Sequence, residues 1–222
     1  MGKTVAMIHT GPVTIQPLNS LVPDLLPDTR IINIMDDSLL KDVMAAGHLT
    51  PAVTKRICQY YIMAEQMGAD AILNACSSVG EAADLAAQLI SIPVVKVDAA
   101  MAAAAVERAS VIGVAATVQT TLDPTVRLIE KTAKQKGKGI TVRRLLCPGA
   151  FDALLAGKME EHDRIVSTEL LKLAAEVELI VLAQVSMGRV AAALGDSIQV
   201  PVLTSPRLGI ERLAQVLAEQ GQ

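Results

Sequence analysis

Residues 70–76 read Asp-Ala-Ile-Leu-Asn-Ala-Cys, a short apolar run that ends in a thiol. Continuous apolar runs of this length are typical of parallel strands that are covered on both faces. A second run, residues 178–184, reads Glu-Leu-Ile-Val-Leu-Ala-Gln and lies 108 positions later (184 − 76). A proline follows the last residue of each run by 17 positions, at Pro93 and Pro201 (93 − 76 and 201 − 184). The equal spacing indicates that the chain is a duplication.

Strand-like and helix-like segments alternate along the whole chain. Such alternation predicts a parallel α/β architecture. The predicted strands are Thr4–His9, Arg30–Met35, Ala71–Ala75, Val94–Val97, Val111–Ala116, Thr141–Leu145, Leu179–Ala183 and Val202–Thr204. The predicted helices are Thr50–Met67, Glu81–Leu89, Ala99–Arg108, Pro124–Gln135, Met159–Ala175 and Leu208–Glu219.

The repeat divides the chain into two similar parallel-sheet α/β units, which we expect to be related by pseudo-two-fold symmetry. The first unit is predicted to span residues 1–97, with a C-terminal helix at 207–222 packing back on it, and the second to span residues 98–206. Ligands of parallel α/β units bind beyond the carboxyl ends of the strands. We therefore expect the active site in the cleft between the units. Four loops of small hydroxyl, amide and thiol groups would line it: His9–Thr14, Cys76–Val79, Thr117–Thr121 and Gln184–Met187.

Composition excludes several classes of protein. The chain of 222 residues is 51% hydrophobic and 19% charged, which is typical of a folded core. With one Phe, two Tyr and no Trp, it lacks an aromatic platform for nucleic acid. It has no uncharged apolar run of about 20 residues to span a membrane. No signal peptide, disulfide framework, nucleotide fingerprint or metal-ligand cluster is apparent, so we expect a cytoplasmic protein without cofactor or metal.

Cys76 follows the apolar strand and precedes a helix that is predicted to begin near Glu81. A helix N-terminus favours the thiolate form of a cysteine. The hydroxyls of Ser77 and Ser78 can cap the helix and bind a carboxylate. The competing interpretation is a small buried hydrophobic residue, which is the usual role of a free cysteine. The position at a strand end and the matching loop in the other half favour a catalytic thiol.

Four segments of the chain resemble the signature segments of the Asp/Glu racemase superfamily. That superfamily includes aspartate, glutamate and hydantoin racemases, maleate isomerase and arylmalonate decarboxylase. The order and spacing of the segments are more specific than any one of them, and together they cover nearly the whole chain. They are Ile8–Gly11, Asn74–Ser78, Gly113–Thr120 and Ile180–Met187.

The resemblance implies catalysis in which two cysteines flank a carbon next to a carboxylate. One thiolate removes the proton, and the other thiol delivers a proton to the opposite face. Cys76 matches the first family cysteine, whereas Gln184 stands where the second is expected and can only form hydrogen bonds. The resemblance and the loop positions together nominate as substrate-binding residues His9, Thr10, Asn74, Ser77, Ser78, Thr117, Thr120, Gln184 and Ser186.

Gln184 leaves three alternatives: a reaction with one base, a second acid from elsewhere, or a relative that does not racemise. Cys147 is the candidate for a second thiol, because it follows the predicted strand Thr141–Leu145 and precedes Pro148 and Gly149. A structural cysteine at a turn is the competing interpretation.

We therefore expect a cofactor-independent isomerase, a racemase or epimerase that acts at a carbon alpha to the carboxylate of a small amino-acid-like or related acid. The Cys76 thiol would carry the acid–base chemistry. One alternative is a decarboxylase or other lyase with a single thiol as proton donor. Another is an inactive relative that only binds a small molecule. The expected partner is a small carboxylate, with no nucleic acid or membrane, and a homodimer is the default assembly.

Overall fold

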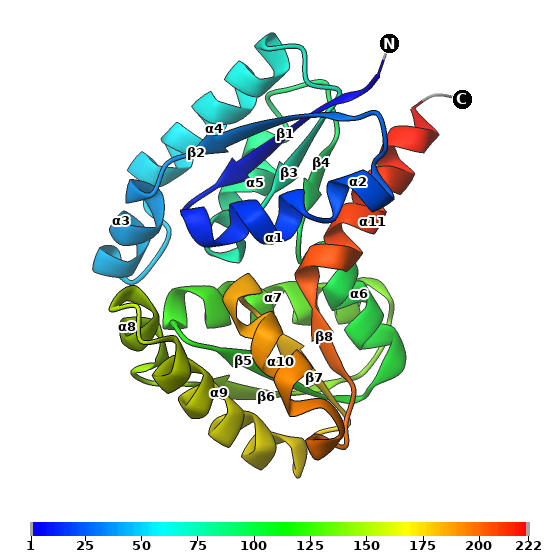
Figure 1. Ribbon diagram of the computed structural model, residues 1–222. Helices are drawn as coiled ribbons and strands as arrows, with labels where there is room; N and C mark the ends of the chain where they lie inside the picture. Colours follow the sequence, from blue (N-terminus) through cyan, green and yellow to red (C-terminus); the bar gives the residue numbers. More distant parts are fainter. Residues whose placement is uncertain (1, 221–222) are drawn as a thin grey trace. The chain divides into compact units, whose positions relative to one another are not determined.

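The computed structural model describes residues 2–220, which form two α/β units. The first unit comprises the chain up to Ala100 together with the segment from Pro206 onward, and the second comprises Met101–Ser205. Figure 1 shows a sheet with helices on both faces in each unit. The strands are β1 (Thr4–His9), β2 (Arg30–Met35), β3 (Ala71–Asn74), β4 (Val94–Lys96), β5 (Val111–Ala116), β6 (Thr141–Leu146), β7 (Leu179–Leu182) and β8 (Val202–Thr204).

The helices and 3-10 turns have the following bounds: η1 (Pro12–Thr14), α1 (Ile15–Asn19), α2 (Val22–Leu25), α3 (Ser38–Ala46), α4 (Pro51–Gln66), η2 (Ser77–Val79), α5 (Gly80–Ala86), α6 (Ala99–Arg108), α7 (Gln119–Gln135), α8 (Ala150–Leu155), α9 (Met159–Ala174), η3 (Val185–Met187), α10 (Gly188–Leu194), η4 (Gly195–Ser197) and α11 (Ser205–Glu219).

The two sheets have the same topology. Their strand orders are β2-β1-β3-β4 and β6-β5-β7-β8, and every neighbouring pair is parallel. The first and third strands of each unit therefore form the central pair, and their carboxyl ends meet at one edge of the sheet. The predicted α/β class with two similar parallel-sheet units is confirmed.

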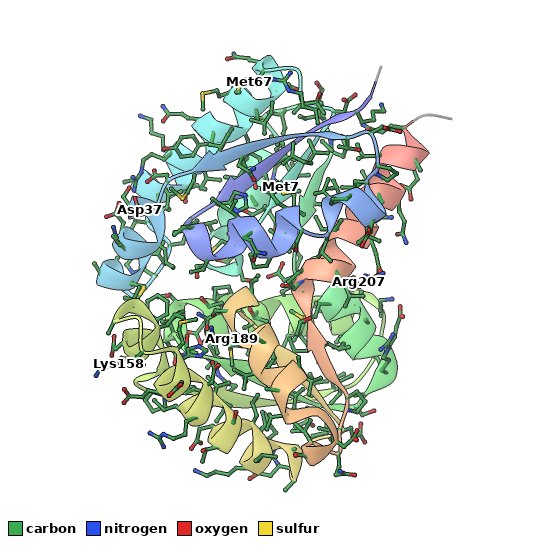
Figure 2. The ribbon with its side chains drawn as sticks, in the orientation of Figure 1. Met7, Asp37, Met67, Lys158, Arg189 and Arg207 are labelled. Atoms are coloured by element: carbon green, nitrogen blue, oxygen red, sulfur yellow. The ribbon has the colours of Figure 1, made fainter. Side chains whose placement is uncertain are left out.

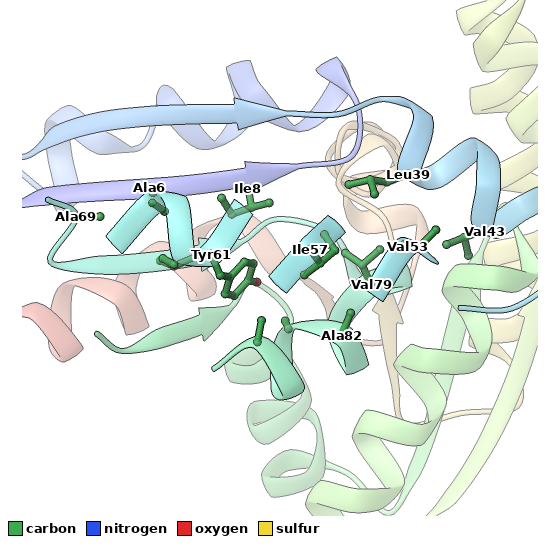
Figure 3. Packing of buried hydrophobic residues seen from close by; sticks show 14 residues of the cluster. Ala6, Ile8, Leu39, Val43, Val53, Ile57, Tyr61, Ala69, Val79 and Ala82 are labelled. Carbon is green, nitrogen blue, oxygen red and sulfur yellow. The ribbon is translucent and has the colours of Figure 1, made fainter. Parts of the chain in front are cut away.

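One face of the first sheet is covered by α3, α4 and α5. Alternate residues of β1, such as Ala6 and Ile8, turn toward these helices because successive side chains of a strand point to opposite faces. Tyr61 of α4 is fully buried among them, together with Ile57 and Val53 of the same helix. Figure 3 shows the Tyr61 ring among the aliphatic side chains of this cluster.

The opposite face of the first sheet is covered by α1, α2 and the C-terminal helix α11. Val5 and Met7 turn to this side, where Ile210 and Leu213 of α11 pack against them. Figure 2 shows Met7 inside the unit, in contrast to Met67, which lies at the surface. The helix predicted at 207–222 begins earlier, at Ser205, and ends at Glu219; residues 221 and 222 lie outside the described residues.

The second sheet carries α8, α9 and α10 on one face. Ile180 and Leu182 of β7 pack there against Val166 and Leu170 of α9. The helix α7 packs along β5 and β6. Among residues 2–220, no helix combines the length and the apolar character that a membrane span requires.

The helix α7 begins at Gln119, although the sequence predicts a start at Pro124. Pro124 lies inside the helix, where a proline removes one backbone hydrogen bond. The apolar face of the helix lies on both sides of Pro124, with Leu122 before it and Val126 and Ile129 after it. Burial of this face outweighs the loss of one backbone hydrogen bond. Consequently Thr120, predicted in a loop, lies in the first turn of α7.

Candidate active site

Strand register places three functional groups beside one another in the first unit. Ile8 of β1 is paired with Asn74 of β3, and Asn74 is paired with Lys96 of β4. Two residues beyond these paired positions lie Thr10, Cys76 and Asp98. Parallel strands deliver their carboxyl ends to the same edge, so the three side chains meet there.

Cys76 is the central member of this group and is half-buried. Burial raises the pKa of its thiol, because an apolar environment disfavours the thiolate. Hydrogen bonds from the side chain of Thr10 and from the backbone and side chain of Ser78 oppose that shift, since they stabilise the thiolate. Nearby Asp98 raises the pKa further through its negative charge. The ionisation of the Cys76 thiol is therefore controlled by burial, by the hydrogen bonds from Thr10 and Ser78 and by the charge of Asp98.

Asp98 was not predicted as a site residue. Its carboxyl group is 3% exposed, and burial raises its pKa, while a hydrogen bond from the Ser77 side chain and the charge of Lys96 oppose the shift. Lys96 is itself paired with Asp84, at 2.7 Å between Nζ and Oδ1. One oxygen of Asp98, Oδ1, is buried without a hydrogen-bond partner. The sequence does contain one signal for Asp98, since this acidic residue comes directly after the predicted strand Val94–Val97.

Asn74 lies under the turn that carries Cys76 and is fully buried. Its Nδ2 donates a hydrogen bond to the Cys76 carbonyl oxygen at 2.9 Å, which fixes the backbone on the way into η2. Its Oδ1 is buried and has no hydrogen-bond partner. The role of Asn74 in binding substrate therefore stays a prediction.

His9 is also fully buried, and both ring nitrogens are engaged within the first unit. Nδ1 lies 2.7 Å from the Thr14 hydroxyl, and Nε2 lies 2.9 Å from Asn33 Oδ1. Burial lowers the pKa of His9, against the smaller effect of its hydrogen bond to Asn33. The ring therefore links the loop after β1 to the neighbouring strand β2. A role of His9 in binding substrate stays a prediction.

In the second unit, the same register brings Thr117 beside Gln184. Ala115 of β5 is paired with Leu182 of β7, and Thr117 and Gln184 each lie two residues further on. Gln184 Oε1 accepts a hydrogen bond from the Thr117 backbone N–H at 2.6 Å and another from the Thr117 hydroxyl at 2.9 Å. Thr117 thus contacts Gln184 through both its backbone and its side chain.

The other predicted residues differ in exposure. Ser77 and Ser78 are buried beside Cys76, whereas Ser186 in η3 is partly exposed. The Thr120 hydroxyl is buried and has no hydrogen-bond partner.

Cys147 lies in the hydrophobic core of the second unit. Its side chain is fully buried and packs with Ala150, Val166 and Met187. Burial, with a smaller effect of the Glu169 charge, raises the pKa of this thiol to about 12. A thiol in such surroundings is almost entirely neutral at neutral pH. The catalytic role of Cys147 stays a prediction.

Within residues 2–220, no three His, Cys, Asp or Glu side chains come together in a way that would hold an ion.

The sequence and fold were compared with known proteins. The family model of Asp/Glu/hydantoin racemases matches residues 9–213. No curated protein matches the chain. Among solved structures, a glutamate racemase isoform from Bacillus anthracis has a similar fold, with a TM-score of 0.76 and 19% identity over 99% of this chain and 83% of that one.

Two further structures have the same fold. Glutamate racemase from Francisella tularensis, solved in complex with D-glutamate, matches with a TM-score of 0.78 and 17% identity, covering 99% of this chain and 82% of that one. Allantoin racemase from Klebsiella pneumoniae matches with a TM-score of 0.63 and 15% identity, covering 99% and 89%.

Proposed function

Because the chain belongs to the Asp/Glu/hydantoin racemase family, we propose that it is a cofactor-independent isomerase with the Cys76 thiol as its base. The substrate is a small acid with a hydrogen on the carbon next to its carboxylate. The observation that carries the proposal is the setting of Cys76, half-buried at a strand end with hydrogen bonds from Thr10 and Ser78.

The reaction begins with the thiolate of Cys76. The sulfur takes the alpha proton and becomes a thiol, while the electron pair of the C–H bond moves into the carboxylate to give an enolate-like intermediate. Hydrogen-bond donors stabilise the growing charge on the substrate oxygens. Return of a proton to the opposite face inverts the carbon, whereas return to the same face restores the starting enantiomer.

The family pattern has two cysteines, and Gln184 stands where the second is expected. This isomerase therefore has one catalytic thiol. A carboxamide neither gives nor takes a proton near neutral pH. Cys147 is buried with its pKa at about 12, which makes it a poor substitute. We propose that solvent water supplies the proton on the second face, and that the Cys76 thiol then returns its own proton to the hydroxide that remains. If the Cys76 thiol exchanges its proton with solvent before it returns one to the same face, the substrate exchanges with retention. We expect this to be faster than inversion, because inversion needs water, a weaker acid than a thiol, as the proton donor.

A decarboxylase is the second candidate, and the same observation favours it. A single thiol is sufficient to protonate the enolate that remains when carbon dioxide leaves a malonate. Such an enzyme delivers its proton to one face only and yields one enantiomer.

The test is proton exchange in deuterated water, followed by NMR. Purified protein is incubated separately with single enantiomers of amino acids and hydantoins and with 2-substituted malonates. Wild type, Cys76→Ala and Cys147→Ala are compared, and circular dichroism checks that each variant is folded.

Three outcomes distinguish the candidates. Deuterium at the alpha carbon with slower inversion, lost in Cys76→Ala and kept in Cys147→Ala, supports the one-thiol isomerase. Release of carbon dioxide from a malonate with one product enantiomer supports the decarboxylase. If Cys76→Ala exchanges as fast as wild type, the thiol is not the base and the proposal is wrong.

A further inference from the structure

The hydrogen bonds between Thr117 and Gln184 fix which way the Gln184 amide points. The Thr117 backbone N–H is a donor in every protonation state, so the atom that faces it at 2.6 Å has to be an acceptor. A flipped amide would bring its NH2 group against this N–H, donor to donor. The contact with the Thr117 hydroxyl, at 2.9 Å, goes to the same Oε1. The orientation of Gln184 therefore follows from its partner.

Thr117 uses both of its donors on Gln184. Its N–H and its hydroxyl proton are directed to Oε1, and its side chain is 95% buried. A hydroxyl has a single proton to donate, and the Thr117 hydroxyl directs it to Gln184 rather than to a substrate carboxylate in this arrangement. We conclude that Thr117 is a positioning residue for Gln184.

The fixed orientation leaves the amide nitrogen of Gln184 as the presented group. Gln184 is partly exposed, and its Nε2 donates to no group within residues 2–220. Nε2 carries two N–H donors, which match the lone pairs of a carboxylate or carbonyl oxygen. The Thr120 hydroxyl, three residues after Thr117, also has no hydrogen-bond partner, and it is buried.

From this arrangement we propose that Gln184 Nε2 is a hydrogen-bond donor for a carboxylate or carbonyl oxygen of the substrate. The inference rests on the proposed function, which it deepens by giving a role to the residue that replaces the family thiol. At this position the chain binds an oxygen and transfers no proton. Because Thr117 binds Oε1, the Gln184 amide turns its Nε2 toward the substrate. The amide oxygen is then kept away from the substrate oxygen, which it would repel.

The decisive variant is Gln184→Glu. A glutamate still accepts both hydrogen bonds from Thr117 through one oxygen, so the local packing is kept. The NH2 group is replaced by a second, negatively charged oxygen, which repels an anionic ligand. Loss of one hydrogen bond to a charged group corresponds to roughly 10–100-fold in affinity.

Two variants of Thr117 test the positioning role. Thr117→Val removes the hydroxyl but keeps the backbone N–H, so the amide becomes less restrained and affinity falls less than in Gln184→Glu. Thr117→Ser restores the hydroxyl and is expected to rescue affinity. A residue that only supported the fold would change thermal stability and leave the affinity of the folded protein unchanged.

The direct readout is the side-chain amide signal of Gln184 in nitrogen–proton correlation NMR, assigned by its disappearance in Gln184→Glu. Acetate, L-alanine and methylmalonate are titrated as probes. We expect at least one probe to shift this signal in a saturable way, with binding weakened by about tenfold or more in Gln184→Glu. The control is Gln119, whose amide donates to Asp123 at 2.7 Å and should not shift.

The inference is overturned if the Gln184 amide signal stays unchanged with all three probes, or if Gln184→Glu binds the probes as tightly as wild type. Neither result touches the role of Cys76, because deuterium exchange in wild type and its loss in Cys76→Ala are measured independently. Conversely, a Gln184 shift in a protein that catalyses no exchange would support the donor site and contradict the proposed function.

Discussion

The Thr10 side chain hydrogen-bonds the sulfur of Cys76 across the central pair of strands of the first unit. The matching pair of the second unit is Thr117 and Gln184, at the same distance beyond the paired strands. The duplication has thus kept a threonine beside the central residue of each half, although that residue is a thiol in one half and an amide in the other. In the first unit, this contact helps to set how readily the thiol ionises.

We predict that Thr10→Val raises the pKa of Cys76. Burial already raises it, and the variant removes a hydrogen bond that stabilises the thiolate. At a fixed neutral pH the thiolate fraction falls, so alkylation by iodoacetamide slows and its midpoint moves to higher pH. Mass spectrometry of the alkylated Cys76 peptide against pH measures the midpoint.

Thr29→Val is a suitable control, because the Thr29 hydroxyl contacts only the exposed carbonyl of Pro27. An unchanged Cys76 midpoint in Thr10→Val would show that the threonine does not stabilise the thiolate.

We predict that Asp98→Asn changes how stability depends on pH. Burial raises the pKa of Asp98 in the folded state, so the unfolded chain ionises first as pH rises from about 4. The wild type therefore loses stability from this group as pH rises toward the folded pKa, and full stability is present only below the unfolded pKa. Asparagine does not titrate and still accepts a hydrogen bond from Ser77. The variant should gain stability relative to wild type across that window.

Urea unfolding at several pH values measures the difference for Asp98→Asn. A constant difference in unfolding free energy across the window would contradict a raised pKa at Asp98.

The third prediction concerns Cys147. Because its side chain is fully buried among apolar neighbours, Cys147→Ala should cost about 1 kcal/mol of unfolding free energy and leave deuterium exchange intact. Cys147→Ser buries a hydroxyl in the same place and should cost roughly 1–3 kcal/mol. Urea unfolding and the exchange assay are the measurements. If Cys147→Ala stayed folded but lost deuterium exchange, Cys147 would be a second catalytic thiol.

The strands could be predicted from the sequence because burial on both faces leaves an unbroken apolar run. Thr4–His9 and Val111–Ala116, in which all residues but the first are buried, have the predicted bounds. Arg30–Met35 also has the predicted bounds, although it is an edge strand without a buried residue. Short helices such as α1 and α10 gave no such signal, since α1 has five residues with Pro17 among them and α10 has only seven. Their positions are decided by packing on the sheets.

The candidate site was predictable in part for the same reason. The repeat aligns Cys76 with Gln184 and nominates both, since each follows a buried strand. Asp98 comes beside Cys76 only because β4 pairs with β3 in one register, which a single sequence does not reveal. The inward turn of His9 likewise depends on Asn33 of β2, a partner 24 residues away.

The last prediction tests how the C-terminal helix is held on the first unit. A Cβ atom at Gly209 of α11 would lie 2.7 Å from the Val97 carbonyl oxygen and 3.0 Å from the Val97 Cα, both of them backbone atoms that cannot swing aside. Gly209→Ala should therefore push α11 away from the sheet and cost roughly 1–3 kcal/mol of unfolding free energy. Gly139→Ala is the matched control, because nothing lies within 4 Å of the added methyl group. Urea unfolding of both variants measures the difference.

Gly209→Ala should also speed hydrogen exchange in α11, since Ile210 and Leu213 would lose contact with Val5 and Met7. Equal stability of the two variants would mean that the helix can shift by a few tenths of an ångström without loosening its packing.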